Sequence, residues 1–297
     1  MPGSASAAAE RITAGQAAIL GVVEGLTEYL PISSTGHLIL TSHAMGLTHY
    51  QAGGGAFGAG LAKTQAIDAF EIVIQLGAIL AVVGLYRRRV GQMLTGLVGR
   101  NSAGLKLVGL LLVAFVPAAA VGLALHKPIK EHLFSPGAVS LALAVGGAAM
   151  IACEYFFWIR RKGQPRTQID TMTLRQALAI GLVQCLALWP GTSRSMVTIV
   201  AALVVGLDMV AAAEFSFLLA LPTLGAATLY EAAKSHQQLL ATAGAGGLII
   251  GLVVSGVVAA VAVKALVRWL TRHGLIPFGI YRIILAGVVY VYFLMMR

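Results

Sequence analysis

The stretch GVVEGLTEYLPISSTGHL at residues 21–38 aligns almost residue for residue with GLVQCLALWPGTSRSMVT at residues 181–198. Each is an apolar helical run that breaks at a proline and then enters a short segment rich in Ser and Thr. Proline removes a backbone donor and disfavours helix at the residue before it, so each stretch predicts two short helices joined by a turn. The same break in both halves of the chain indicates an internal repeat.

The composition is that of a membrane protein. The mean hydropathy is +0.87, and only 11% of the residues are charged, whereas a soluble domain carries about 25%. The apolar stretches long enough to span a bilayer, which takes about 20 residues, are 70–86, 107–125, 137–159, 211–230, 244–267 and 276–296. The two broken stretches, 12–46 and 173–207, are each predicted to form a re-entrant hairpin that is buried in protein or lines a wet cavity.

This pattern predicts an all-α polytopic membrane protein with an inverted-topology repeat. A tail at 1–11 precedes repeat 1 at 12–160, and a cytoplasmic linker at 161–172 leads to repeat 2 at 173–297. Each repeat holds one hairpin and three spans, an odd number, so the second repeat is expected upside down relative to the first. The equivalences expected are Gln16 with Gln176, Gly21 with Gly181, Glu24 with Gln184, Pro31 with Pro190 after a one-residue gap, and Glu71 with Glu214.

Basic residues are concentrated in alternate loops. The basic segments are 87–106, 160–175 and 264–273, and the poorer ones are 126–136 and 231–242. Cytoplasmic loops carry such an excess, which places the basic set inside and both residues 1–69 and the C-terminus outside. The Gly-rich segment 51–66 is then an outer loop. The net charge of +10 fits loops that face the headgroups of membrane lipids, and no nucleic-acid partner is expected.

Two carboxylates lie within the first apolar run. Glu24 and Glu28 are four residues apart, so they share one helix face. Ionisable groups in apolar stretches usually mark a functional site, and two carboxylates this close repel unless a cation or a proton relieves them. Mg²⁺ commonly binds one or two carboxylates together with substrate phosphates, and Ca²⁺ also prefers oxygen ligands. We therefore expect Glu24 and Glu28 to hold a divalent cation, either Mg²⁺ or Ca²⁺.

The first break supplies hydroxyl groups and an imidazole. Ser33, Ser34 and Thr35 occupy the N-cap region of the next helix, so at least one should cap it. A helix N-terminus with free N–H groups also attracts anions. His37 lies one turn further on and can transfer protons near neutral pH.

The second break supplies a cation among hydroxyls. Arg194 stands between Ser193 and Ser195, with Thr198 one turn later. Its planar guanidinium suits two-point contact with phosphate and keeps its charge. The three hydroxyl residues are expected to contact substrate with Ser33 and Thr35. The two breaks together supply an acid pair, hydroxyl groups, an imidazole and a guanidinium. This combination favours phosphoryl transfer.

Four longer motifs carry a resemblance to a known family. They are EGLTEYLPISSTGH (24–37), CLALWPGTSRS (185–195), AEFSFLLALP (213–222) and IPFGIYR (276–282). They resemble the undecaprenyl-pyrophosphate phosphatase family of the bacitracin-resistance type, over about residues 12–295. Two departures, Thr192 where an aromatic residue is frequent and Met196 where Gly is common, concern the shape of the pocket.

The resemblance implies hydrolysis of undecaprenyl pyrophosphate to undecaprenyl phosphate and phosphate. This reaction recycles the lipid carrier of cell-wall synthesis in the bacterial inner membrane, with the site open to the outer side. It implies that Glu24 and Glu28 form the acidic pair and that Arg194 holds the pyrophosphate. It also implies that Ser34 is the nucleophile and His37 its acid/base.

Several alternatives stay open at this point. A polyprenyl-phosphate transporter or flippase would use the same inverted-repeat architecture. Water could replace Ser34 as the nucleophile, and the oligomeric state is open, with a homodimer as one alternative. The broader lipid-phosphatase superfamily is excluded, because it needs a His after the Arg on one later helix and the run after Arg194 reads SMVTIVAALVVGLD.

Overall fold

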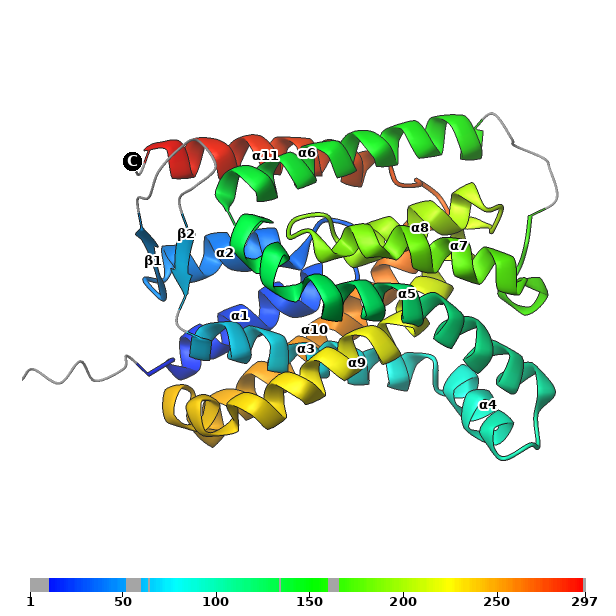
Figure 1. Cartoon of the computed structure of the whole chain (residues 1–297), viewed down its shortest axis with the longest axis horizontal. Coiled ribbons are helices and arrows are strands. Elements are labelled where there is room, and N and C mark those ends of the chain that lie inside the picture. Colours follow the sequence, from blue (N-terminus) through cyan, green and yellow to red (C-terminus); the bar gives the residue numbers. More distant parts are fainter. Residues whose placement is uncertain (1–10, 52–59, 64, 134, 160–165, 296–297) are drawn as a thin grey trace, which may run out of the picture.

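The computed structural model describes residues 11–51, 60–63, 65–133, 135–159 and 166–295, and helices dominate it (Figure 1). The first half contains α1 (Ala14–Thr27), α2 (Ser34–Ala44), α3 (Gln65–Leu85), α4 (Arg87–Leu97), α5 (Ser102–Leu133), α6 (Pro136–Cys153) and the π-helical turn η1 (Glu154–Ile159). The second half contains the 3-10 turn η2 (Ile169–Thr171), α7 (Leu174–Gln184), the 3-10 turn η3 (Cys185–Leu188), α8 (Arg194–Val204), α9 (Met209–Thr242), α10 (Gly244–Leu270) and α11 (Ile276–Met295).

The six predicted spans are confirmed as helices that are long and apolar enough to cross a membrane. They are Ile67–Leu85, Ser102–Leu125, Pro136–Phe156, Met209–Thr242, Gly244–Leu270 and Ile276–Met295. Two of them run further than expected: α5 continues to Leu133 and α9 to Thr242, through the loops predicted at 126–136 and 231–242. Helix α9 ends where Gly244 adopts a φ of +63°, a conformation that favours glycine.

Two further segments differ from the prediction. The loop expected at 87–106 is mostly helix α4, whose apolar residues Val90, Met93, Leu94 and Leu97 recur with the helical spacing that marks an amphipathic helix. The all-α prediction also misses a short antiparallel pair, β1 (Thr48–Gln51) and β2 (Gly60–Lys63), in which Thr48 pairs with Lys63 and Gln51 with Gly60. Part of the outer loop predicted at 51–66 lies outside the described residues, as do most of the N-terminal tail and residues 161–165 of the linker.

The two broken stretches form matched helix pairs, α1–α2 and α7–α8. Thr13 caps α1 and Thr173 caps α7, each in a reciprocal capping box with the Gln three residues later. Ser33 caps α2 and Ser193 caps α8, with φ values of 74° and 70°. Thr13–Thr173 and Ser33–Ser193 share one offset along the chain, whereas Pro31 and Pro190 are one position closer together. The one-residue gap expected at the prolines is therefore closed again before the second cap.

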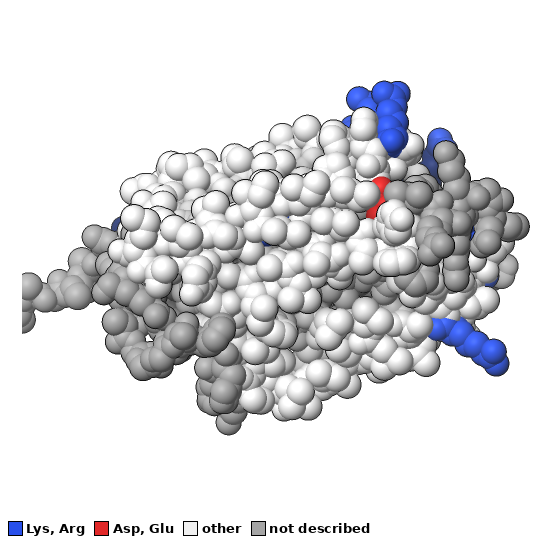
Figure 2. All heavy atoms as spheres, turned by 90° about the horizontal axis from the view of Figure 1, so that it is seen from above, with Lys and Arg blue, Asp and Glu red and all other residues white. Residues whose placement is uncertain are grey.

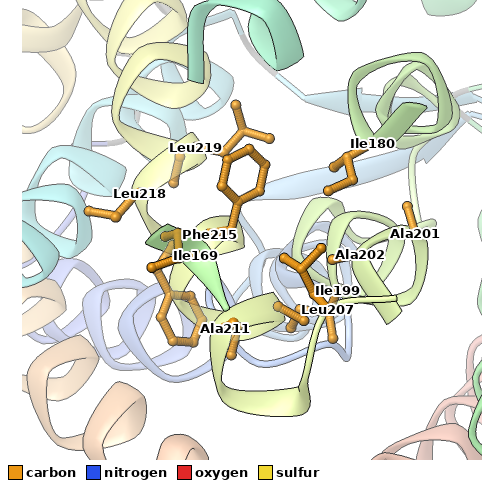
Figure 3. Close-up of a cluster of buried hydrophobic side chains, with 14 of the residues drawn as sticks. Ile169, Ile180, Ile199, Ala201, Ala202, Leu207, Ala211, Phe215, Leu218 and Leu219 are labelled. Atoms are coloured by element: carbon orange, nitrogen blue, oxygen red, sulfur yellow. The ribbon is translucent and has the colours of Figure 1, made fainter. Parts of the chain in front are cut away.

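The two helix pairs lie in the middle of the molecule (Figure 1). Helices α6 and α11 pack together on one side of them, and α3, α9 and α10 pack on the other. A large apolar core fills the space between α7, α8 and α9 (Figure 3). Ile180, Ile199, Phe215 and Leu218 are among its fully buried members.

Charge is distributed unevenly over the surface. On the face shown in Figure 2, the Lys and Arg side chains gather toward one end, and a broad band beside them consists almost entirely of uncharged residues. A belt without charge is what the hydrocarbon core of a bilayer requires.

Close helix packing depends on glycine, as is common in membranes. A Cβ added to Gly77 of α3 would collide with the carbonyl oxygen of Leu252 in α10. Replacing Gly77 by Ala should therefore lower the free energy of unfolding by roughly 1–3 kcal/mol, the usual cost of overpacking. Thermal unfolding in detergent measures this. Gly84→Ala is the matched control, because a Cβ at Gly84 of the same helix meets nothing within 4 Å; equal midpoints for both variants would contradict the close packing of α3 on α10.

Candidate active site

The two breaks meet at a buried ion pair. Glu28, just after α1, accepts a hydrogen bond from Ser34 Oγ at 2.8 Å through Oε2. Its other oxygen lies 3.2 Å from Arg194 Nη2, at the start of α8. The two charged side chains are only 5% and 9% exposed. A buried pair of this kind is favourable only when further hydrogen bonds satisfy both partners, so the carboxylate, the hydroxyl and the guanidinium form one unit built from both halves of the chain.

Arg194 is only partly satisfied by the protein. Its Nη1 donates to the carbonyl oxygen of Ser216 at 2.9 Å, and its guanidinium lies 5.7 Å from the ring centroid of Tyr29. Its Nε is buried and has no hydrogen-bond partner among the described residues. An unmatched donor on a planar guanidinium fits an additional oxygen acceptor, such as one from a phosphate group.

Glu24 lies deeper and is even less satisfied. It is fully buried, and neither carboxylate oxygen makes a hydrogen bond with a described residue. The polar side chains that interact electrostatically with Glu24 are those of Glu28, Glu71 and Gln75. A buried carboxylate without a partner costs several kcal/mol, and here two of its neighbours are also carboxylates. The carboxylate oxygens of Glu24 therefore fit the binding of a hard cation, which would neutralise their charge.

The fit to a cation is limited to two carboxylates. Within the described part of the chain, no three His, Cys, Asp or Glu side chains converge as a metal site. Glu71, the third acid in the region, accepts a hydrogen bond from Ser42 Oγ at 2.5 Å. Glu24 and Glu28 are the groups that would hold Mg²⁺ or Ca²⁺, together with oxygens of a bound phosphate.

His37 is oriented by two partners, neither of which is Ser34. Its Nδ1 lies 2.7 Å from the carbonyl oxygen of Ser33, and its Nε2 lies 2.7 Å from the hydroxyl of Tyr281. A carbonyl oxygen can only accept, so Nδ1 carries a proton, and in the neutral ring Nε2 accepts from Tyr281. The carboxylate that accepts from Ser34 is that of Glu28, whereas the resemblance implies His37 as the acid/base of Ser34.

The residues at the two N-caps hold strained backbone. Ser33 accepts from the N–H of Gly36 at 3.3 Å, and Ser193 accepts from the N–H of Met196 at 3.3 Å. Both adopt left-handed φ values, which cost about 1–3 kcal/mol at a residue other than glycine and cluster at functional sites. The predicted capping is confirmed for Ser33.

The other residues predicted to contact substrate differ in how deeply they are buried. Ser195 and Thr198 are fully buried and brace the backbone: Ser195 Oγ donates to the carbonyl oxygen of Leu30 at 2.9 Å, and Thr198 Oγ1 donates to that of Arg194 at 2.8 Å. Thr35 and Ser193 are half-buried. The structure thus brings all the predicted residues to the two breaks, and gives Ser195 and Thr198 supporting contacts.

Sequence reasoning missed the role of Arg282. This fully buried arginine of α11 donates to the carbonyl oxygens of Gly191 at 3.0 Å and Pro31 at 3.4 Å, one from each break. It also donates to Ala142 in α6 at 3.1 Å. An arginine within an apolar span was the available signal. The same IPFGIYR motif contains Tyr281, the partner of His37.

Glu214, predicted to correspond to Glu71, belongs to a separate cluster. It accepts from Arg89 Nε at 2.8 Å, while Arg89 Nη1 donates to Asp170 at 2.7 Å. The hydrogen bond from Arg89 holds the pKa of Asp170 below its usual value. This cluster links α4, η2 and α9 and touches none of the residues at the two breaks.

The fold and the site together define a helical, multi-pass membrane protein with a charged centre buried between two helix breaks. Within that class, the chain belongs to the family described as bacitracin resistance protein BacA, which matches residues 17–288. That range includes every candidate site residue.

Three relatives are similar over most of their length. The chain is 48% identical over 274 residues to the undecaprenyl-diphosphatase of Sorangium cellulosum (strain So ce56), covering 92% of this chain and 84% of that protein. It is 46% identical to undecaprenyl-diphosphatase 2 of Rhodospirillum rubrum, covering 92% and 93%. It is 43% identical to undecaprenyl-diphosphatase 1 of Chromobacterium violaceum, covering 89% and 91%.

Replacing Arg282 by Met should destabilise the protein, because the carbonyls of Pro31 and Gly191 would be left buried and unpaired. Each such group costs about 1–3 kcal/mol. Thermal unfolding of the purified protein measures the loss. Arg272→Met is the matched control, since Arg272 is exposed near the end of α10 and should leave the midpoint unchanged. A wild-type midpoint for Arg282→Met would show that the two breaks do not depend on it.

Proposed function

We propose that this protein hydrolyses undecaprenyl diphosphate to undecaprenyl phosphate and inorganic phosphate. The observation that carries the proposal is the buried Glu28–Arg194 pair with Ser34 on one side and unsatisfied polar atoms of Glu24 and Arg194 on the other. The names of the three relatives supply the substrate. Recycling of the lipid carrier and resistance to bacitracin follow from this activity.

The contacts of Ser34 support a role as nucleophile. Its hydroxyl already donates to Glu28, so the carboxylate can accept that proton as Oγ attacks the terminal phosphorus. The bond from phosphorus to the bridging oxygen breaks, and undecaprenyl phosphate leaves with the electron pair. Water then hydrolyses the phosphoserine and restores Ser34. Arg194 stabilises the charge that develops on the phosphoryl oxygens.

His37 and Tyr281 form a second proton-transfer pair. The hydroxyl of Tyr281 donates to Nε2 of His37, and both side chains are at least partly accessible, since Tyr281 is 42% exposed. We assign the pair to proton exchange with the leaving group and with water. A divalent cation held by Glu24 and Glu28 would supply charge neutralisation at the diphosphate.

The inverted repeat and its orientation are part of the same proposal. The matched capping boxes and the matched left-handed serines support two re-entrant hairpins related by an internal repeat. The collection of basic side chains toward one end (Figure 2) supports a cytoplasmic position for that end. The site then opens to the outer side of the bacterial inner membrane, and a homodimer stays a prediction.

A transporter or flippase of polyprenyl phosphate is the alternative that this architecture favours. Transport needs a sealed bilayer, whereas hydrolysis does not. Release of phosphate from undecaprenyl diphosphate by the purified protein in detergent therefore supports the phosphatase. Absence of release, together with lipid movement across liposomes, would replace hydrolysis by transport.

The cation is tested by chelation. Excess chelator should abolish phosphate release, and Mg²⁺ or Ca²⁺ should restore it. Glu24→Gln removes one of two anionic ligands and should raise the cation concentration that gives half-maximal activity by about tenfold or more. Loss of a residue that only hydrogen-bonds to a metal ligand already costs about tenfold in metal affinity. Glu231→Gln is the control, because Glu231 lies on α9 away from the two breaks and accepts a hydrogen bond from Ser235 of the same helix. Full activity in excess chelator would end the metal assignment.

Ser34→Ala tests the nucleophile. If Ser34 attacks phosphorus, turnover should fall by roughly 10³-fold or more, as it does when a covalent nucleophile is removed. Ser140→Ala is the control, because the hydroxyl of Ser140 donates to the carbonyl oxygen of Pro136 in its own helix at 2.8 Å. Near-normal turnover in Ser34→Ala would assign the attack to water, with Glu28 as its base.

Thiol labelling tests the orientation. In a background carrying Cys153→Ala and Cys185→Ala, Gln237→Cys should react with an impermeant thiol reagent in intact cells, and Ser102→Cys should not. Gln237 and Ser102 are both exposed and lie at opposite ends of the predicted spans. Labelling of Ser102→Cys alone would reverse the orientation.

A further inference from the structure

A cavity lined by basic residues lies apart from the two breaks. It has a volume of about 380 Å³ and opens where α3, α4 and α10 meet. Its lining includes Gly84, Tyr86, Arg87, Arg88, Arg89 and Lys264. It shares no residue with the candidate active site, so hydrolysis does not account for its charge.

Three of its four cations lack partners. Arg89 is neutralised by Asp170 and Glu214. Arg87, Arg88 and Lys264 take part in no ion pair or hydrogen bond within the described ranges of the chain. All three side chains are exposed, and an anion that enters the cavity would relieve the repulsion between these like charges.

The backbone at this point also favours an anion. Helix α4 begins at Arg87, and its N-cap residue Tyr86 offers no side-chain hydrogen bond. The first N–H groups of a helix left without a side-chain cap can bind a phosphate oxygen. The cavity therefore combines free cations with unsatisfied donors.

The surface that leads to the cavity is apolar. Leu80 lies one turn before Gly84 on α3, and Val257 and Val261 lie on the face of α10 that carries Lys264. These three side chains are 58%, 61% and 65% exposed. Because α3 and α10 are packed together, acyl chains can lie along them. The missing side chain at Gly84, which has nothing within 4 Å, leaves room at the entrance.

We propose that this cavity binds the phosphate of an anionic phospholipid headgroup, with the acyl chains along α3 and α10. A basic pocket between membrane helices is the kind of site that recognises such headgroups. A free phosphate ion would use the cations but not the apolar surface. The ligand therefore carries both a negative phosphate and hydrocarbon chains.

Lipid binding to the purified full-length protein tests the proposal. Phosphatidylglycerol and phosphatidylcholine of identical acyl chains are titrated separately and followed by native mass spectrometry. The wild-type protein should retain one phosphatidylglycerol and release phosphatidylcholine. A variant with Arg87→Gln, Arg88→Gln and Lys264→Gln should bind phosphatidylglycerol about a hundredfold more weakly, since each cation near the lipid contributes about fivefold.

The control removes the same charge elsewhere. Arg100→Gln, Arg175→Gln and Arg272→Gln alter three exposed arginines outside the cavity and should change the affinity less than threefold. Both variants must unfold at the wild-type temperature. The proposed site would be overturned if the protein bound both lipids equally. It would also be overturned if the cavity variant and the control variant lost the same affinity for phosphatidylglycerol. Displacement of phosphatidylglycerol by an equal concentration of inorganic phosphate would overturn the lipid as its ligand.

Discussion

The contact between Glu28 and Arg194 is a buried ion pair that joins the two halves of the chain. Removing two charges from water is expensive, and the attraction between them offsets this cost only with help from further hydrogen bonds. Ser34 supplies one to the carboxylate, and the carbonyl of Ser216 accepts one from the guanidinium. The remaining imbalance, at Glu24 and at Arg194 Nε, is what a phosphate group and a cation would correct.

The helix breaks make this contact possible and must themselves be held. Continuous helices would have no N-termini at the centre of the molecule. Ser34 and Arg194, which each begin a helix after a break, would then not both reach Glu28. Arg282 joins both breaks through the carbonyls of Pro31 and Gly191, and Ser195 ties the second break to Leu30 of the first. The strain stored at Ser33 and Ser193 is tolerated because these contacts fix the surrounding backbone.

Local patterns in the sequence were enough for the spans and the breaks. Hydropathy located six spans, and proline followed by Ser and Thr located both breaks, because these signals act over a few residues. The contact of His37 with Tyr281 joins residues 244 positions apart, and no local pattern encodes it. The same holds for Ser34, which spacing placed near His37 and which the fold turns toward Glu28. Helix α4 was missed because the run of arginines at its start was interpreted as a cytoplasmic loop, although the spacing of its apolar residues is helical.

A double-mutant cycle between Glu28 and Arg194 is the most direct test of a site shared by the two halves. The quantity to measure is kcat/KM for undecaprenyl diphosphate in the wild type, Glu28→Gln, Arg194→Lys and the double variant, all folded to the same extent. The pair acts as one unit, so the double variant should lose less than the product of the two single losses, with a coupling free energy of about 1–3 kcal/mol. Strictly additive losses would show that the two residues act independently and would contradict a site built across the two breaks.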